Sequence, residues 1–164
     1  MKHSITKLIA FTLCAVLSLG LLAACGGASV RNDVAVQDLA AAMRRAVGME
    51  DLLVSLDGTF LGLTGTEAEQ VGEHEILVSG GSTIDEIGVF KAGTLSVDAL
   101  KALVEDYLSQ YTEKRWPMIE LYNPSEQPKL TDAEVTVLGD YVMYTILSEA
   151  DRATAKAAFE AALK

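Results

Sequence analysis

Cys25 is the residue to which the sequence assigns chemistry most directly. It follows the small pair Ala23-Ala24, at the end of an uncharged apolar run over residues 8–22 that Lys2 and Lys7 precede. A basic start, a short apolar run and small residues before a cut are typical of a secretory signal. A Cys directly after that cut resembles the bacterial lipobox, where the thiol is acylated and the Cys becomes the mature N-terminus. We therefore predict lipidation at Cys25. The lipid would anchor the chain to a membrane, because each buried lipid methylene contributes about 0.8 kcal/mol.

Two other interpretations of this N-terminus fit it less well. A transmembrane helix needs about 20 apolar residues, and the run here is shorter. A plain secretory signal cut elsewhere would leave Cys25 as a lone free thiol outside the cell. Cys14 is not a candidate for the lipidated Cys, because Leu13 rather than a small residue precedes it. We predict a lipoprotein signal peptide over residues 1–24, the lipidated Cys with a flexible tether over 25–32, and a single α+β extracytoplasmic domain over 33–164.

The chain is acidic, with 13 Lys and Arg against 23 Asp and Glu. Lys2 and Lys7 leave with the predicted signal, which holds no acid, so the mature chain has a formal net charge of 11 − 23 = −12. Nucleic-acid binding requires clustered Lys and Arg, so we expect no nucleic-acid partner. With Cys25 acylated, no thiol remains for a disulfide, and the fold must depend on packing.

His74 is the one histidine of the predicted mature chain, and it lies between Glu73 and Glu75. Zinc there would lack its usual further nitrogen or sulfur ligands. Ser-His-Asp and Cys-His catalysis need a base that a third group orients. We therefore predict no catalytic residue, no metal and no small-molecule cofactor. We expect His74 to be a solvated residue that leads into a strand.

Two pairs of neighbouring acids, Asp85-Glu86 and Glu105-Asp106, are the other candidates for chemistry. Glycoside hydrolysis uses two carboxylates that face each other across a cleft at a set separation. Neighbours in a strand point to opposite faces, and Glu105-Asp106 falls on the polar side of a predicted helix. We therefore expect both pairs to be solvated. Convergence of two or more of these acids and His74 in a concave pocket would instead favour an enzyme.

The first elements follow from helical spacing and turn residues. Residues 33–47 show helical spacing of apolar side chains, and Gly48 offers a C-terminal stop. Residues 49–72 mix apolar side chains with glycines and predict only short turns, with one helical turn at 66–71.

A strand-strand-helix pattern then begins. Residues 75–79 and 83–91 predict two strands around a Gly-rich hairpin turn. Ser96 predicts the N-cap of a long helix, and Trp116-Pro117 should end it. The expected apolar stripe of that helix consists of Val97, Leu100, Val104, Tyr107, Leu108 and Tyr111.

The same pattern recurs after a linker over residues 118–129. Residues 134–138 and 141–147 predict a second pair of strands, and Ser148 predicts the cap of a final helix. Two β-β-α units favour an α+β fold with a four-stranded antiparallel sheet. We predict two layers, with the helices packed mainly on one face, plus an N-terminal helix.

The linker and the residues just before it hold the candidate partner-contact residues Trp116, Tyr122 and Asn123. Aromatic side chains on a semi-rigid loop can anchor a partner, because they contribute large contact area at low entropic cost. The alternative is that Trp116 and Tyr122 close over the end of the sheet as part of the core.

Several short motifs together resemble a family of clostridial-type bacterial lipoproteins. They are Leu-Ala-Ala-Cys-Gly-Gly at Cys25, the segment 85–92, Tyr122-x-Pro124-x-Glu126-x-x-Lys129-Leu130, and Gly139-x-Tyr141-Val142. That family is catalogued as a domain of unknown function. The resemblance implies a lipid-anchored protein on the extracytoplasmic face of a Gram-positive type cell membrane, and it carries over no ligand or catalytic residues.

The sequence thus favours a membrane-anchored interaction module over an enzyme. Its expected partners are the membrane, through the lipid at Cys25, and an unknown envelope or extracellular protein. The alternative is a cell-envelope hydrolase with a carboxylate-based site.

Overall fold

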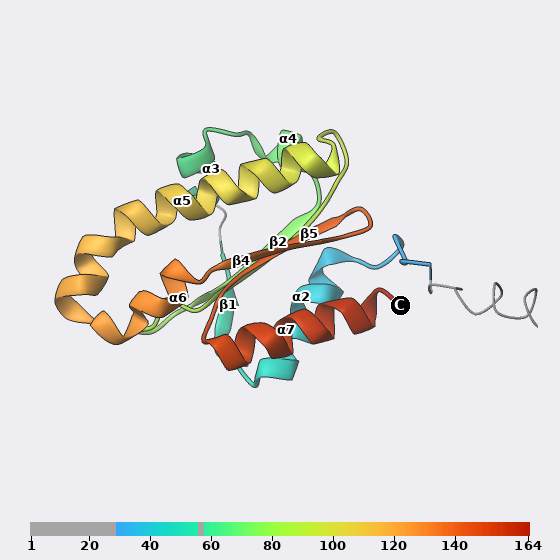
Figure 1. Ribbon diagram of the computed structural model, residues 1–164. Coiled ribbons are helices and arrows are strands. Elements are labelled where there is room, and N and C mark those ends of the chain that lie inside the picture. Colours follow the sequence, from blue (N-terminus) through green and yellow to red (C-terminus); the bar gives the residue numbers. More distant parts are fainter. Residues whose placement is uncertain (1–28, 56–57) are drawn as a thin grey trace, which may run out of the picture.

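The computed structural model describes residues 29–55 and 58–164. Helix α5 (Val97–Tyr122) lies over one face of an antiparallel sheet, and α2 (Val36–Val47) and α7 (Glu149–Ala162) lie over the other (Figure 1). The predicted α+β class is confirmed. The prediction of two layers with helices mainly on one face is wrong. The predicted signal peptide and Cys25 lie outside the described residues.

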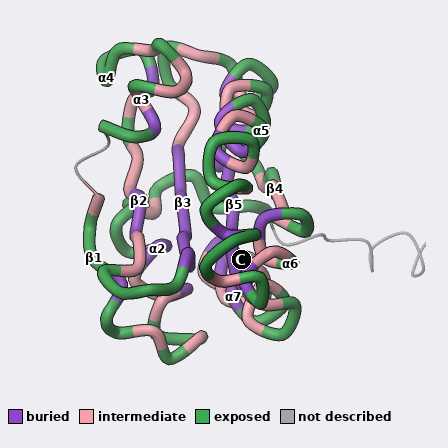
Figure 2. Tube along the Cα trace, turned by 90° about the vertical axis from the view of Figure 1, so that its left-hand side faces the viewer, coloured by how far each residue is buried: buried purple, intermediate pink, exposed green. Residues whose placement is uncertain are grey.

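Among the described residues, the sheet has five strands in the order β1-β2-β3-β5-β4, and each neighbouring pair is antiparallel. The four predicted strands are confirmed, although β3 begins at Glu86 rather than at residue 83. Central strands β3 and β5 are buried almost throughout (Figure 2). The strands are β1 (Leu52–Val54), β2 (His74–Ser79), β3 (Glu86–Lys91), β4 (Glu134–Leu138) and β5 (Tyr141–Ile146).

The extra strand is β1, and it corrects the predicted four-stranded sheet. β1 pairs along the outer edge of β2, and only Leu52 of its three residues is buried. So short a segment has no alternating pattern of its own, and its pairing with β2 defines it as a strand. The short helices α3 (Gly58–Thr64) and α4 (Ala68–Val71) follow, and α4 confirms the helical turn expected at 66–71.

Side-chain alternation explains why both faces of the sheet are covered. Successive side chains of a strand point to opposite faces, so Val89 and Phe90 on β3 belong to two different apolar clusters. Phe90 packs in the cluster under α5, and Val89 packs in the cluster with α2 and α7. Because β3 and β5 carry apolar residues on both faces, a helix on one face alone would leave the other face in water.

Helix α5 continues past the point where the sequence predicts its end. Ser96 caps it, accepting a hydrogen bond of 3.3 Å from the Ala99 amide, but the helix runs through Pro117 to Tyr122. Pro117 removes one backbone donor, while Ile119 on the following turn is buried in the cluster beneath the helix. Packing therefore maintains the helix beyond the proline.

The predicted linker is also helical. After α5, residues of this segment form the 3-10 turn η1 (Pro124–Glu126) and helix α6 (Gln127–Thr131). Ser148 caps α7 as predicted, because its hydroxyl accepts from the Asp151 amide. None of the helices in the described part of the chain is long and apolar enough to cross a membrane.

Candidate functional site

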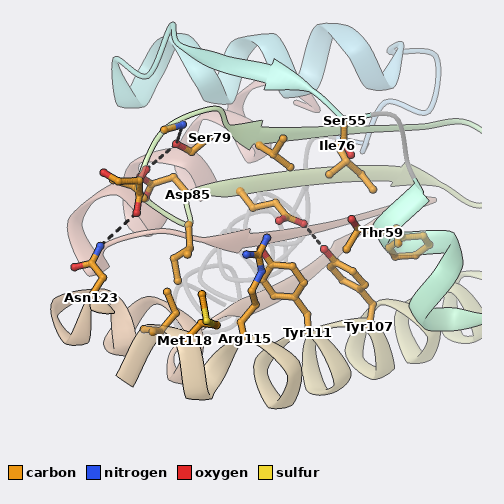
Figure 3. Close-up of a pocket in the computed structure, with 18 of the residues that line it drawn as sticks. Ser55, Thr59, Ile76, Ser79, Asp85, Tyr107, Tyr111, Arg115, Met118 and Asn123 are labelled. Carbon is orange, nitrogen blue, oxygen red and sulfur yellow. Dashed lines mark hydrogen bonds between the residues drawn. The ribbon is translucent and has the colours of Figure 1, made fainter. Parts of the chain in front are cut away.

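A cavity of about 320 Å³ lies between the C-terminal half of α5 and the sheet. Its walls come from the start of β3, the β2–β3 loop, α3 and α5 (Figure 3). Tyr107, Tyr111 and Arg115 project from α5 toward the strands and form one side of it (Figure 3). These three side chains are four residues apart, so they share one face of the helix.

Glu86 lies at the buried end of this cavity, with 3% of its surface exposed. Its Oε1 accepts hydrogen bonds from the hydroxyls of Tyr107 and Tyr144, each at 2.5 Å. Burial raises the pKa of the Glu86 carboxyl, and the tyrosine hydrogen bonds and the charge of Arg115 oppose that rise without cancelling it. Glu86 is thus a carboxyl group that holds its proton more tightly than an exposed glutamate does.

The tyrosines around Glu86 remain protonated donors at neutral pH. Burial, with the nearby Glu86 charge, raises the pKa of Tyr111 to about 12. Burial raises the pKa of Tyr107 and Tyr144 as well. The floor of the cavity is therefore a network in which tyrosine hydroxyls donate to a buried carboxyl group.

A second buried group connects the β2–β3 loop to the segment after α5. Lys129 Nζ lies 2.7 Å from Asp85 Oδ1 and 2.9 Å from Glu126 Oε2. Glu126 Oε2 also accepts a hydrogen bond from the Ile84 amide at 3.1 Å. Burial works to lower the pKa of Lys129, but its bonds to the two carboxylates outweigh burial and raise it. These contacts fix the loop that forms one wall of the cavity.

Arg115 lies on α5 at the cavity wall. Its guanidinium carbon is 5.2 Å from the centre of the Tyr111 ring, a cation–π contact. Within residues 29–55 and 58–164, Arg115 forms no salt bridge. An oriented guanidinium without an ionic partner can bind an anionic group.

The three predicted contact residues lie in different environments. Trp116 is half-buried against the core, as the alternative interpretation expected. Tyr122 is 72% exposed, so that interpretation is wrong for it. Asn123 donates from Nδ2 to the Ser82 carbonyl at 3.3 Å, and both Tyr122 and Asn123 line the cavity. The structure thus brings Tyr122 and Asn123 together at the cavity.

The predictions for the two acid pairs and for His74 have different outcomes. Glu105-Asp106 is exposed on α5, as predicted. The prediction that Asp85-Glu86 is solvated is wrong, since both residues are buried and both line the cavity. His74 begins β2 but is half-buried, with Nδ1 2.7 Å from the Gly72 carbonyl oxygen and its ring stacked on Phe90. In the described part of the chain, no group of three potential ligands could hold a metal.

Sequence reasoning missed the role of Tyr107, Tyr111 and Arg115, although their spacing of four places them on one helix face. It also missed Lys129, whose position three residues after Glu126 makes an ion pair within one helical turn available. Met118 and Leu121 were missed too, and both are exposed beside Tyr122.

No family model, curated protein or solved structure matches this chain. The resemblance to clostridial-type lipoproteins therefore stays a prediction from the quoted motifs.

Proposed function

We propose that this chain is a membrane-anchored extracytoplasmic lipoprotein that acts as a binding module, with the cavity beneath α5 as its binding site. The observation that carries the proposal is the cavity of about 320 Å³ with Arg115, Tyr122 and Asn123 among its lining residues. Cavities of this size are typical of binding sites for small molecules or single side chains. The proposed partner is an envelope or extracellular protein, or a small molecule that such a protein presents.

The rim of the cavity supports contact with a partner larger than the cavity itself. Leu121 and Tyr122 follow Met118 by three and four residues, so the three side chains lie on one face of α5. Their exposed fractions are 59%, 70% and 72%. Exposed apolar side chains beside a concave site are typical of protein contact surfaces.

The path of the N-terminal segment indicates how a membrane anchor at Cys25 would orient the domain. Val30 lies against Gly139, in the turn between β4 and β5, and the Arg31 amide donates to the Leu163 carbonyl at 2.9 Å. This is the end of the sheet where Lys91 pairs with Tyr141, whereas Glu86 and the cavity lie at the other end of β3. The described chain therefore begins at the end of the domain away from the cavity (Figure 1), and an anchor there would leave the cavity open to partners outside the cell.

A cell-envelope hydrolase is the second candidate, because Asp85 and Glu86 both line the cavity. The partners of these acids favour binding instead. Lys129 holds Asp85 Oδ1, and two tyrosines hold Glu86 Oε1. The two acids are also consecutive in the chain rather than on facing walls, as a hydrolytic pair would be. Release of a chromophore from aryl glycosides by the wild-type chain, and its loss in Glu86→Gln, would favour the hydrolase.

Photocrosslinking in cells tests the binding module. A benzoylphenylalanine in place of Tyr122 keeps an aromatic side chain at the rim, and the same group in place of Ser109, exposed elsewhere on α5, is the matched control. We expect defined crosslinked products from position 122 and none of them from position 109. Equal products from both positions, or none from position 122, would contradict the proposal.

A further inference from the structure

We infer that the cavity binds a small monocarboxylate with a flat apolar body, whose carboxylate pairs with Arg115. This inference names the ligand class of the binding site proposed above and rests on that proposal. It follows from the one cation among the described residues that line the cavity, from the orientation of Arg115 and from the apolar side chains in the same lining.

Among the described residues that line the cavity, Arg115 is the only cation. Asp85 is paired with Lys129, which also pairs with Glu126. Glu86 is bonded to the hydroxyls of Tyr107 and Tyr144, and burial raises its pKa. Arg115 has no salt bridge within the described part of the chain. An anionic ligand would supply the missing partner.

Arg115 is also oriented before any ligand arrives. Its guanidinium carbon lies over the Tyr111 ring, 5.2 Å from the ring centre, and Tyr111 itself is buried. A planar guanidinium offers parallel N–H donors that match the two oxygens of a carboxylate. Because Tyr111 limits the freedom of Arg115, less side-chain entropy is lost when the anion binds.

The neighbouring acids limit the ligand to one negative charge. Asp85 and Glu126 share the single charge of Lys129, so this cluster keeps one net negative charge beside the cavity. The whole chain carries a formal charge of −10. A phosphate monoester would bring about two negative charges at neutral pH, and Arg115 would offset only one of them. A carboxylate matches Arg115 without an excess.

The remaining walls fit a flat apolar body. Met118 and Tyr122 line the cavity with exposed fractions of 59% and 72%, so they have surface on which a ligand can pack. The rings of Phe60 and Tyr107, deeper in the lining, are already buried against each other, with their centres 4.9 Å apart. Rings stack on or pack edge-on to such side chains.

Calorimetric titration of the full chain in detergent tests the ligand class with four probes that share one phenyl ring. Benzoate is the monoanion, benzamide the neutral analogue, benzylamine the cation and phenyl phosphate the dianion. We expect benzoate to bind at least about tenfold more tightly than each of the others, because only it makes a charge-assisted pair without excess charge. Arg115→Gln should weaken benzoate binding about tenfold, and Arg115→Lys should restore only part of it.

The matched control is Lys114→Gln, which removes an exposed cation next to Arg115 that does not line the cavity. It should leave benzoate binding unchanged. The inference is overturned if benzoate does not bind, if another probe binds as tightly, or if Arg115→Gln has no effect in a variant that melts like the wild type. Crosslinks from position 122 without benzoate binding would overturn this inference and leave the proposed function standing. The absence of both the crosslinks and benzoate binding would overturn the inference and the proposed function together.

Discussion

Gly88 on β3 and Tyr144 on β5 are direct partners across the sheet, and the Tyr144 ring occupies the place where a side chain of residue 88 would begin. A Cβ on Gly88 would lie 2.0 Å from Cε1 of Tyr144. The absence of that Cβ lets the Tyr144 ring cross β3, so that its hydroxyl reaches Glu86 at 2.5 Å. The floor of the cavity thus depends on a glycine that is not among the residues lining the cavity.

Gly88→Ala should therefore destabilise the fold. Overpacking in a dense core typically costs about 1–3 kcal/mol, and here the clash is with a fully buried ring. Denaturant titration should show this loss for Gly88→Ala and almost none for Gly93→Ala, where nothing lies within 4 Å of the added carbon. In a double-mutant cycle, Tyr144→Val should relieve part of the cost. Additive effects of the two changes would mean that the ring is not the obstacle.

Leu100→Ala tests the packing of α5 on the sheet. Leu100 is fully buried in the cluster that contains Ile76, with Val78 packed at its edge, which confirms the helix face predicted from the sequence. Removing a buried leucine side chain typically costs about 2–5 kcal/mol, and thermal melting should show a clear drop. Leu121→Ala, at a site on the same helix that is mostly exposed, should melt within error of the wild type. A drop of equal size for both variants would contradict this packing.

The elements with strong local signals were predictable from the sequence, and those set by long-range packing were not. Ser96 and Ser148 predict the starts of their helices because an N-cap hydrogen bond joins residues only three apart in sequence. β1 was missed because its definition comes from pairing with β2. The layer formed by α2 and α7 on the second face of the sheet did have a sequence signal. The continuous apolar run at 141–144 in β5 is typical of a strand buried on both faces. The end of α5 was placed too early because the burial of Ile119 outweighs the effect of Pro117.

The candidate site was predictable only at its rim. Tyr122 and Asn123 stood out as polar and aromatic residues among prolines, and both line the cavity. Glu86 was expected in solvent because neighbours in a strand point to opposite faces, so that Asp85 and Glu86 would not act as a pair. Its burial depends on hydroxyls from Tyr107 and Tyr144, which are 21 and 58 residues away in sequence. No local pattern reports such a network.

Glu86→Gln should change how stability depends on pH. The folded-state pKa of Glu86 is raised above 4.5, so its contribution to stability is fully present below pH 4.5 and is lost as pH rises through the raised value. The groups that face it are Tyr107, Tyr111 and Arg115 from α5 and Tyr144 from β5.

The glutamine side chain of this variant cannot ionise and can still accept both tyrosine hydrogen bonds. The melting midpoint of the wild type minus that of the variant should therefore fall as pH rises from about 4.5 to 8. Scanning fluorimetry over this range measures the difference. A difference that is constant with pH, or one that grows in favour of the wild type as pH rises, would mean that burial does not raise the pKa of Glu86.

Cys25→Ser tests the anchor. If Cys25 is diacylated after cleavage between Ala24 and Cys25, the variant should be released into the medium or stay uncleaved. Labelling of cells with an alkyne fatty acid, followed by fractionation, measures this. Cys14→Ser is the matched control and should be labelled and anchored like the wild type. Unchanged labelling and attachment of the Cys25 variant would contradict the lipoprotein proposal.

The central claim is that the cavity beneath α5 and its rim form the binding site. A benzoylphenylalanine in place of Met118 reports occupancy of the rim through the yield of crosslinked product in cells. Tyr122→Ala with Asn123→Ala should lower that yield about fivefold or more, since loss of an important contact typically costs more than about 1 kcal/mol. Circular dichroism and melting should be unchanged, and Glu105→Ala with Asp106→Ala on the exposed face of α5 should keep the full yield. An undiminished yield in the Tyr122 and Asn123 variant, with the fold intact, would contradict the claim.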